Sequence, residues 1–181
     1  MNIAHLTAAD FCTSTWSGGT TTELYLYPET GSYAARDFRF RISSATVDLE
    51  ESDFTPLPGV ERYITPLSGS FVLTHPDMPP VEMPPLAPPY RFSGQISTHC
   101  VGKATDFNLM LKGCNGHMTL CRHTAPIRPG FNGFYAVEDT IFSLNGQAFA
   151  MKQGDLLTVF SDENAALEFG DCPALACWVQ I

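Results

Sequence analysis

The sequence predicts an all-β protein with few or no helices, folded as two antiparallel β-barrels in one chain. No long window repeats apolar residues at the helical spacing of i, i+3, i+4 and i+7. Short runs rich in β-branched and aromatic residues, separated by Gly and Pro, instead follow one another along the whole chain. Many short antiparallel strands at close spacing are typical of a barrel or a sandwich.

Each predicted strand is a short apolar or alternating run that ends at a turn residue. Pro28 ends the first run, and the run 38–47 is the longest. The step Leu144-Asn-Gly-Gln147 predicts a hairpin, because Asn-Gly supplies the two positive-φ residues of a type I′ turn. The predicted strands are 20–27, 38–47, 61–66, 70–74, 90–92, 98–101, 107–111, 117–123, 133–137, 140–144, 147–151, 155–160, 165–169 and 175–180.

The length of 181 residues suffices for one sizeable core or for two small β units that share one. We predict two halves, 1–113 and 114–181, that form one compact unit. In the second half, the Asn-Gly hairpin is followed by Gly154-Asp155 and an apolar strand. That order resembles cupin barrels, although no internal sequence repeat marks a duplication.

Charge and composition disfavour several classes of partner. The net charge is −9 and the ten Lys and Arg are scattered, so we expect neither nucleic acid nor an anionic membrane surface as a partner. A small anionic ligand stays open, because local charge decides its binding. The first ten residues do not have the pattern of a signal peptide, and no window approaches the length of a membrane span. We therefore expect a cytoplasmic protein.

We predict no metal, no other cofactor and no catalytic residue. None of the five His forms the H-x-H pair with which cupin enzymes usually begin a metal site. The nearest approach is the strand 117–123, where His117, Cys121 and His123 share one face, but no acidic residue follows before Glu138. The six Cys include no C-x-x-C pair, and both the G-x-S-x-G elbow and the phosphate-loop pattern are missing.

The segment His75–Pro89 is unusually rich in proline, with seven Pro in fifteen residues. Such a segment forms neither a helix nor a central strand. One interpretation of residues 76–89 is an extended loop that covers a sheet edge. The other is a ligand for a proline-recognising domain, which would make the protein a structural or partner-binding one.

Polar residues on predicted strands mark a candidate pocket. Alternation puts Phe40 and Ile42 on one face of the run 38–47, and Arg41 and Ser43 on the other. An Arg at the mouth of a barrel could hold a carboxylate in bidentate fashion, whereas the alternative is a structural ion pair on an exposed face. Further polar residues on or beside strands are Glu23, Arg62, Asp106 and Asn108.

Taken in order, several motifs resemble the HutD/Ves family over roughly residues 13–112. They are Trp16-Ser-Gly-Gly-Thr-Thr-Thr-Glu23 with Tyr27-Pro28, Asp37-Phe-Arg-Phe-Arg41-Ile-Ser43, Phe54-Thr-Pro-Leu-Pro58-Gly59-Val-Glu-Arg62, Leu67-Ser-Gly69, Phe92-Ser-Gly94 and Asp106-Phe-Asn108-Leu-Met110.

The resemblance implies an RmlC-like fold with two cupin barrels. It also implies a protein with a ligand pocket, without known catalytic activity, that is linked to histidine utilisation. It further implies a regulatory role exerted by binding a small anionic metabolite such as N-formylglutamate, a di-acid that Arg41 and Arg62 would hold. The residues that it places in the ligand pocket are Trp16, Glu23, Arg41, Ser43, Arg62, Asp106 and Asn108.

Two further expectations accompany this one. The alternative function is a metal-independent isomerase or lyase, in which Glu23 or Asp106 acts as the base and Arg41 stabilises an enolate. Barrel proteins of this size also often pair through sheet edges, so we expect a homodimer.

Overall fold

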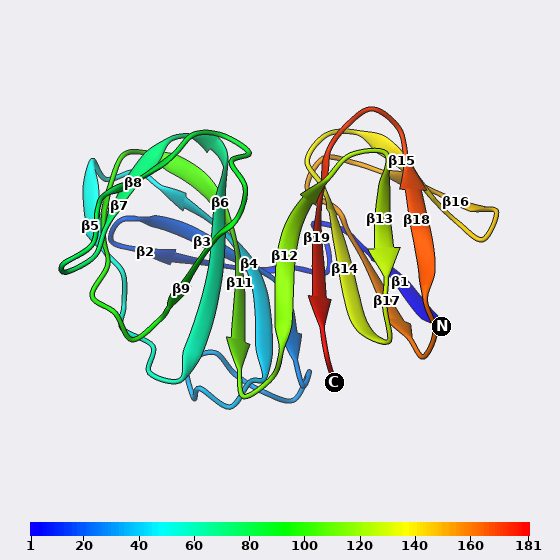
Figure 1. Ribbon diagram of the computed structural model, residues 1–181, viewed down its shortest axis with the longest axis horizontal. Helices are drawn as coiled ribbons and strands as arrows, with labels where there is room; N and C mark the ends of the chain where they lie inside the picture. The colour runs from blue at the N-terminus through cyan, green and yellow to red at the C-terminus, as the bar shows by residue number, and fades with distance from the viewer. The chain divides into compact units, whose positions relative to one another are not determined.

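The computed structural model describes residues 1–181 and contains nineteen β-strands and no helix (Figure 1). The prediction of an all-β protein is therefore confirmed. No segment forms a helix of the length and apolarity that crossing a membrane requires. Phe40 and Ile42, which the predicted alternation puts on one face, are fully buried on β4 (Phe40–Val47).

The chain forms two compact units, one of residues 12–113 and one of residues 1–11 with 114–181. Sequence position alone puts residues 1–11 with the N-terminal half, but backbone pairing puts them with the C-terminal one. There β1 (Asn2–Leu6) pairs antiparallel with β17 (Leu156–Ser161) over its whole length. His5 adds a side-chain contact, since its Nε2 lies 2.8 Å from Oδ2 of Asp155.

The unit of residues 12–113 contains two antiparallel sheets. The larger has the strand order β2 (Cys12–Trp16), β3 (Gly19–Tyr27), β4, β11 (Ala104–Lys112), β6 (Val60–Gly69) and β9 (Tyr90–Ser93). The smaller has the order β5 (Glu51–Asp53), β10 (His99–Val101), β7 (Phe71–Thr74) and β8 (Val81–Met83). Ile64 and Phe92 of the larger sheet and Phe71 and Leu73 of the smaller one belong to one apolar core.

The other unit repeats this arrangement of a larger and a smaller sheet. The larger has the order β1, β17, β14 (Gly130–Ala136), β19 (Ala174–Val179) and β12 (Gly116–Cys121). The smaller has the order β13 (Thr124–Ile127), β18 (Ala165–Phe169), β15 (Thr140–Leu144) and β16 (Gln147–Met151). Its core includes Phe134, Phe142, Leu157 and Leu167, all fully buried.

The prediction of closed barrels is wrong in detail, because all four sheets are open. Closure requires the last strand of a sheet to pair with the first. Here β2 pairs only with β3 and β16 only with β15, and no backbone pairing joins the two sheets of a unit. The core of each unit is thus enclosed by two facing sheets, which leaves room for a cavity between them.

The proline-rich segment contributes a strand as well as a loop. Val81–Met83 forms β8, which pairs with β7 at the edge of the smaller sheet, and proline-containing turns flank it. An edge strand needs hydrogen bonds on one side only, which is why proline is tolerated there. Pro126 lies inside β13, which is also an edge strand.

Candidate functional site

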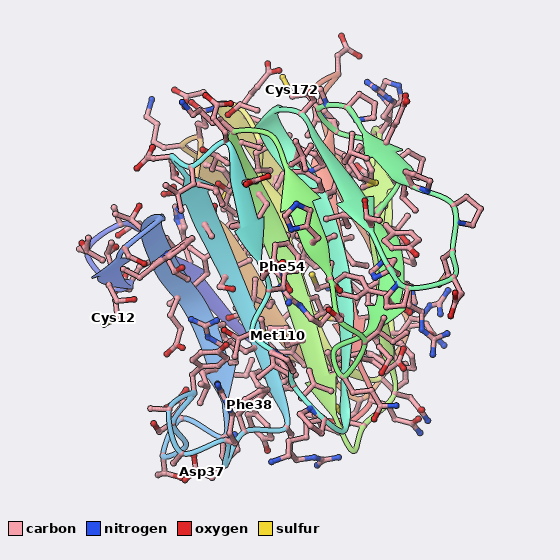
Figure 2. The ribbon with its side chains drawn as sticks, turned by 90° about the vertical axis from the view of Figure 1, so that its left-hand side faces the viewer. Cys12, Asp37, Phe38, Phe54, Met110 and Cys172 are labelled. Atoms are coloured by element: carbon pink, nitrogen blue, oxygen red, sulfur yellow. The ribbon has the colours of Figure 1, made fainter.

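A cavity of about 390 Å³ opens on the unit of residues 12–113. Strands β2, β3, β4, β6 and β11 of the larger sheet line it, together with Tyr33 and residues 52–55. Figure 2 faces this unit, and the labelled Phe54 and Met110, two of the apolar lining residues, lie near the centre of the view. Six of the seven predicted site residues line this one cavity: Trp16, Arg41, Ser43, Arg62, Asp106 and Asn108.

Strand register explains why these side chains meet. On β11, Asp106, Asn108 and Met110 are spaced by two residues and share one face. Met110 lies opposite Arg41 on β4 and opposite Arg62 on β6, so the two guanidinium groups flank the same position of the central strand. Asn108 lies opposite Ser43 in the same way. Polar residues spread over the sequence thus form adjacent rows on one sheet face.

Arg41 is already held by partners within the protein. Its Nε donates to Oε2 of Glu23 at 2.6 Å, and its Nη1 donates to Oγ of Ser43 at 3.3 Å. The guanidinium also lies over the ring of Tyr33, 4.2 Å from its centroid. Glu23, the seventh predicted residue, comes from the neighbouring strand β3 and does not line the cavity. Its carboxylate neutralises Arg41 and orients it.

Arg62 is held differently, by aromatic rings. Its guanidinium carbon lies 4.6 Å from the centroid of Phe54 and 5.2 Å from that of Phe92. The side chain is only 7% exposed, and its Nε has no hydrogen-bond partner. Burial lowers the pKa of Arg62, and the charge of Asp106 opposes that shift. A buried cation with a free donor therefore lines the cavity.

Asp106 and Asn108 present unpaired acceptors on the same cavity. Both side chains are buried, and Oδ1 of each has no hydrogen-bond partner. Burial raises the pKa of Asp106 to about 7, although the Arg62 charge and a hydrogen bond from the Ala45 backbone lower it. Both the protonated and the ionised form of Asp106 are therefore populated near neutral pH.

Trp16 stands at the end of β2, where the chain turns into β3. It lines the cavity and is 40% exposed. A Cβ at Gly18 would lie 2.1 Å from Cζ3 of Trp16, so a larger residue there would displace the ring from its present position.

Sequence reasoning missed other lining residues, among them Tyr33, Asp53 and Phe54. Phe54 could have been predicted as a lining residue, because it is the first residue of the motif that ends at Arg62. Tyr33 comes from the loop before β4 and carries no motif signal. The strand with His117 and Cys121, considered above for a metal, has no third ligand nearby. No three His, Cys, Asp or Glu side chains in the structure lie close enough together to hold a metal ion.

Comparison with solved structures gives the same fold class. HutD from Pseudomonas fluorescens SBW25, solved in a formate condition, matches with a TM-score of 0.81 and 21% identity over 99% of this chain and 100% of that one. A conserved protein of unknown function from Pseudomonas aeruginosa PAO1 matches with a TM-score of 0.84 and 22% identity over 99% and 98%. A bacterial pirin from Escherichia coli, in complex with nickel(II), matches with a TM-score of 0.66 and 9% identity over 98% of each chain.

These similarities support a cupin-like all-β fold. No curated protein sequence matches the chain. The sequence profile of the HutD family, in contrast, matches residues 8–176, which is nearly the whole chain and both units. The chain therefore belongs to the HutD family.

Proposed function

We propose that this protein binds a small carboxylate-bearing metabolite in the cavity lined by β2, β3, β4, β6 and β11. One observation carries the proposal: the buried Arg62 guanidinium faces the cavity with an unpaired Nε. Leaving a charged donor buried and unpaired costs roughly 1–3 kcal/mol or more. A carboxylate is the group that would best offset this cost, because it accepts two parallel hydrogen bonds from one guanidinium.

The remaining polar groups suggest what else the ligand carries. The unpaired oxygens of Asp106 and Asn108 are acceptors, so they call for an N–H or O–H donor beside the carboxylate. Glu23 already neutralises Arg41, so a second carboxylate would find a partly satisfied guanidinium. N-formylglutamate offers a carboxylate and an amide N–H on one small molecule, and it is the ligand that we propose to test first.

The biological role that we propose rests on family membership. The chain belongs to the HutD family, and a regulatory role in histidine utilisation would follow if a metabolite of that pathway occupied the cavity. Two cupin-like units in one chain would make the protein a bicupin, with the cavity in the unit of residues 12–113.

The test compares ligand binding by the wild type with binding by two arginine variants. N-formyl-L-glutamate, glutarate and formate are titrated by calorimetry against the wild type, Arg62→Met and Arg91→Met. Arg91 is the matched control, because it lies on β9, is exposed and pairs with Glu61 at 2.7 Å. We expect Arg62→Met to weaken binding by roughly 10- to 100-fold, the worth of charge-assisted hydrogen bonds, and Arg91→Met to leave it unchanged. Equal affinity of all three proteins would refute the proposal.

A second candidate function is a metal-independent enzyme that works by acid–base catalysis. The burial of Asp106 favours it, since a carboxyl with a pKa of about 7 is suited to accept a proton at neutral pH. Asp106 would take the proton next to the ligand carboxylate, and Arg62 would stabilise the enolate charge. Proton NMR of N-formyl-L-glutamate in D₂O tests this function. If the wild type makes the α-proton signal disappear and Asp106→Asn does not, the result supports an enzyme. A signal that stays constant with the wild type excludes this reaction.

Two more proposals concern the setting of the protein. We propose that it works in the cytoplasm and that two copies pair through a sheet edge. Strand β2 offers such an edge, because all five of its residues are exposed and it pairs only with β3. Sedimentation velocity on the wild type and on Ser14→Pro, which would disrupt that edge, distinguishes a dimer built on β2 from a monomer.

A further inference from the structure

Of the two arginines that line the cavity with Asp106, only Arg62 is not paired with another carboxylate. On β6, Arg62 forms no ion pair; burial lowers its pKa, and the charge of Asp106 opposes that shift. On β4, Arg41 is paired with Glu23 of β3. Asp106 and Arg62 therefore balance each other inside the cavity, and the site is close to neutral while Asp106 is ionised.

The other groups that face this region do not change the balance. Cys100 of β10 is buried and its pKa is raised to about 11, so it stays neutral. Tyr33 lies over Arg41 with its ring. Asp53 of β5 is exposed at the rim and pairs with His99 at 2.8 Å, which places that charge in water. His75, which directly follows β7, is buried beside Phe92 and Thr98.

A carboxylate that enters the cavity would face a conflict with Asp106. Two negative charges would then share the single free cation Arg62, at a place where the side chains of Arg62 and Asp106 are both buried. Like charges at close range cannot both stay ionised at low cost, and one of them takes up a proton. The ligand carboxylate would form the charge-assisted pair with Arg62, so Asp106 is the group that takes up the proton.

We infer that binding of a carboxylate ligand is coupled to the uptake of one proton by Asp106, so that the pocket is selective for anions at slightly acidic pH. This inference rests on the proposed function. The proton comes from solvent and stays on Asp106, and no covalent bond forms or breaks. The protonated carboxyl has one O–H donor and keeps an acceptor oxygen, so Asp106 can donate to the ligand and still accept from its N–H.

The expected size of the effect follows from proton linkage. The ligand stays ionised above about pH 5, so only the protein titrates in the range of interest. With Asp106 half-protonated near pH 7, the affinity for N-formyl-L-glutamate should fall about tenfold from pH 6 to pH 8. At pH 7.5, calorimetry in buffers of different ionisation enthalpy should report uptake of about 0.8 proton per ligand.

The variants Asp106→Asn and His99→Gln test where the proton goes. Asp106→Asn keeps the shape and stays neutral, so its affinity should not change between pH 6 and pH 8. His99→Gln removes a histidine near the rim and should keep the tenfold change. Should Asp106→Asn fail to fold, the proton count of the wild type still decides.

The outcomes separate this inference from the proposed function. Binding of N-formyl-L-glutamate with the same affinity at pH 6 and pH 8, without proton uptake, overturns the inference and leaves the binding function intact. A pH dependence that persists in Asp106→Asn also overturns it. Absence of binding at every pH refutes the proposed function, and this inference with it.

Discussion

Replacing Arg62 by Met should stabilise the folded protein while it weakens ligand binding. The guanidinium is buried, and its Nε has no partner. An unsatisfied buried donor costs about 1–3 kcal/mol, which an apolar side chain of similar length would not incur. Against this gain stands the loss of two cation–π contacts, with Phe54 and Phe92, of about 0.5–2 kcal/mol in all.

The balance favours the variant by about 1 kcal/mol, because the thioether of Met also packs well against aromatic rings. The comparison is made at pH 6, where Asp106 is mostly protonated and does not need Arg62 as a counter-charge. At pH 8 the variant should gain less, because an ionised Asp106 would be left without its cation. The free energy of unfolding is measured by urea denaturation followed by fluorescence. In a thermal melt, the same gain of about 1 kcal/mol would raise Tm by roughly 2–4 °C.

Arg91→Met is the control, since Arg91 is exposed and its pair with Glu61 should contribute less than about 1 kcal/mol. A loss of 2 kcal/mol or more in Arg62→Met at pH 6 would refute the reasoning. It would mean that the guanidinium supports the fold and that its unpaired donor is no sign of a ligand.

Three other substitutions are expected to act as follows. Glu23→Gln frees Arg41 from its counter-charge, so calorimetry should show formate and N-formyl-L-glutamate binding roughly three- to tenfold more tightly; weaker binding would mean that Glu23 mainly orients Arg41. Burial raises the folded-state pKa of Asp106 from 3.8 to about 7, so its contribution to stability is fully present below about pH 4 and is lost as the pH rises to 7. Urea denaturation across that range should therefore show Asp106→Asn gaining up to about 4 kcal/mol relative to the wild type, and a constant difference would contradict the raised pKa. Asn132→Ala should lose about 2 kcal/mol in the same assay without affecting binding, because the buried Asn132 amide bonds both backbone groups of Arg128; a change below 0.5 kcal/mol would show that the turn holds without it.

Alternation of apolar and polar residues was sufficient to predict the strands at the centre of each sheet. Phe40 and Ile42 of β4 are fully buried, as their spacing indicates. The same signal finds the edge strand β16 but misses other edge strands, such as β2 and β13. Strand β2 has no apolar alternation at all. Strand β13 contains Pro126, and proline in a sequence indicates the end of a strand unless the strand is known to lie at a sheet edge.

The candidate site was predictable in its strands but not in its charge balance. Period-two spacing placed Arg41 with Ser43, and Asp106 with Asn108, on shared faces. Nothing in the sequence indicates that Glu23 satisfies Arg41 and leaves Arg62 free, because that depends on cross-strand register and on which side chain reaches farther. The expectation that Arg41 and Arg62 both hold carboxylates therefore stays a prediction, with Arg41 already paired to Glu23 and Arg62 not.

The polar rows of β4, β11 and β6 also explain how an acidic protein could select a small anion. The net charge of −9 repels polyanions at long range, but salt screens that field beyond about 8 Å. A small carboxylate that reaches the cavity mainly experiences the nearby buried groups, where Arg62 is the free cation and Asp106 can become neutral. A nucleic acid or an anionic membrane would meet the acidic surface first. On the proposed function, we therefore expect the same chain to exclude large anions and to bind a small one when Asp106, the counter-charge of Arg62, takes up a proton.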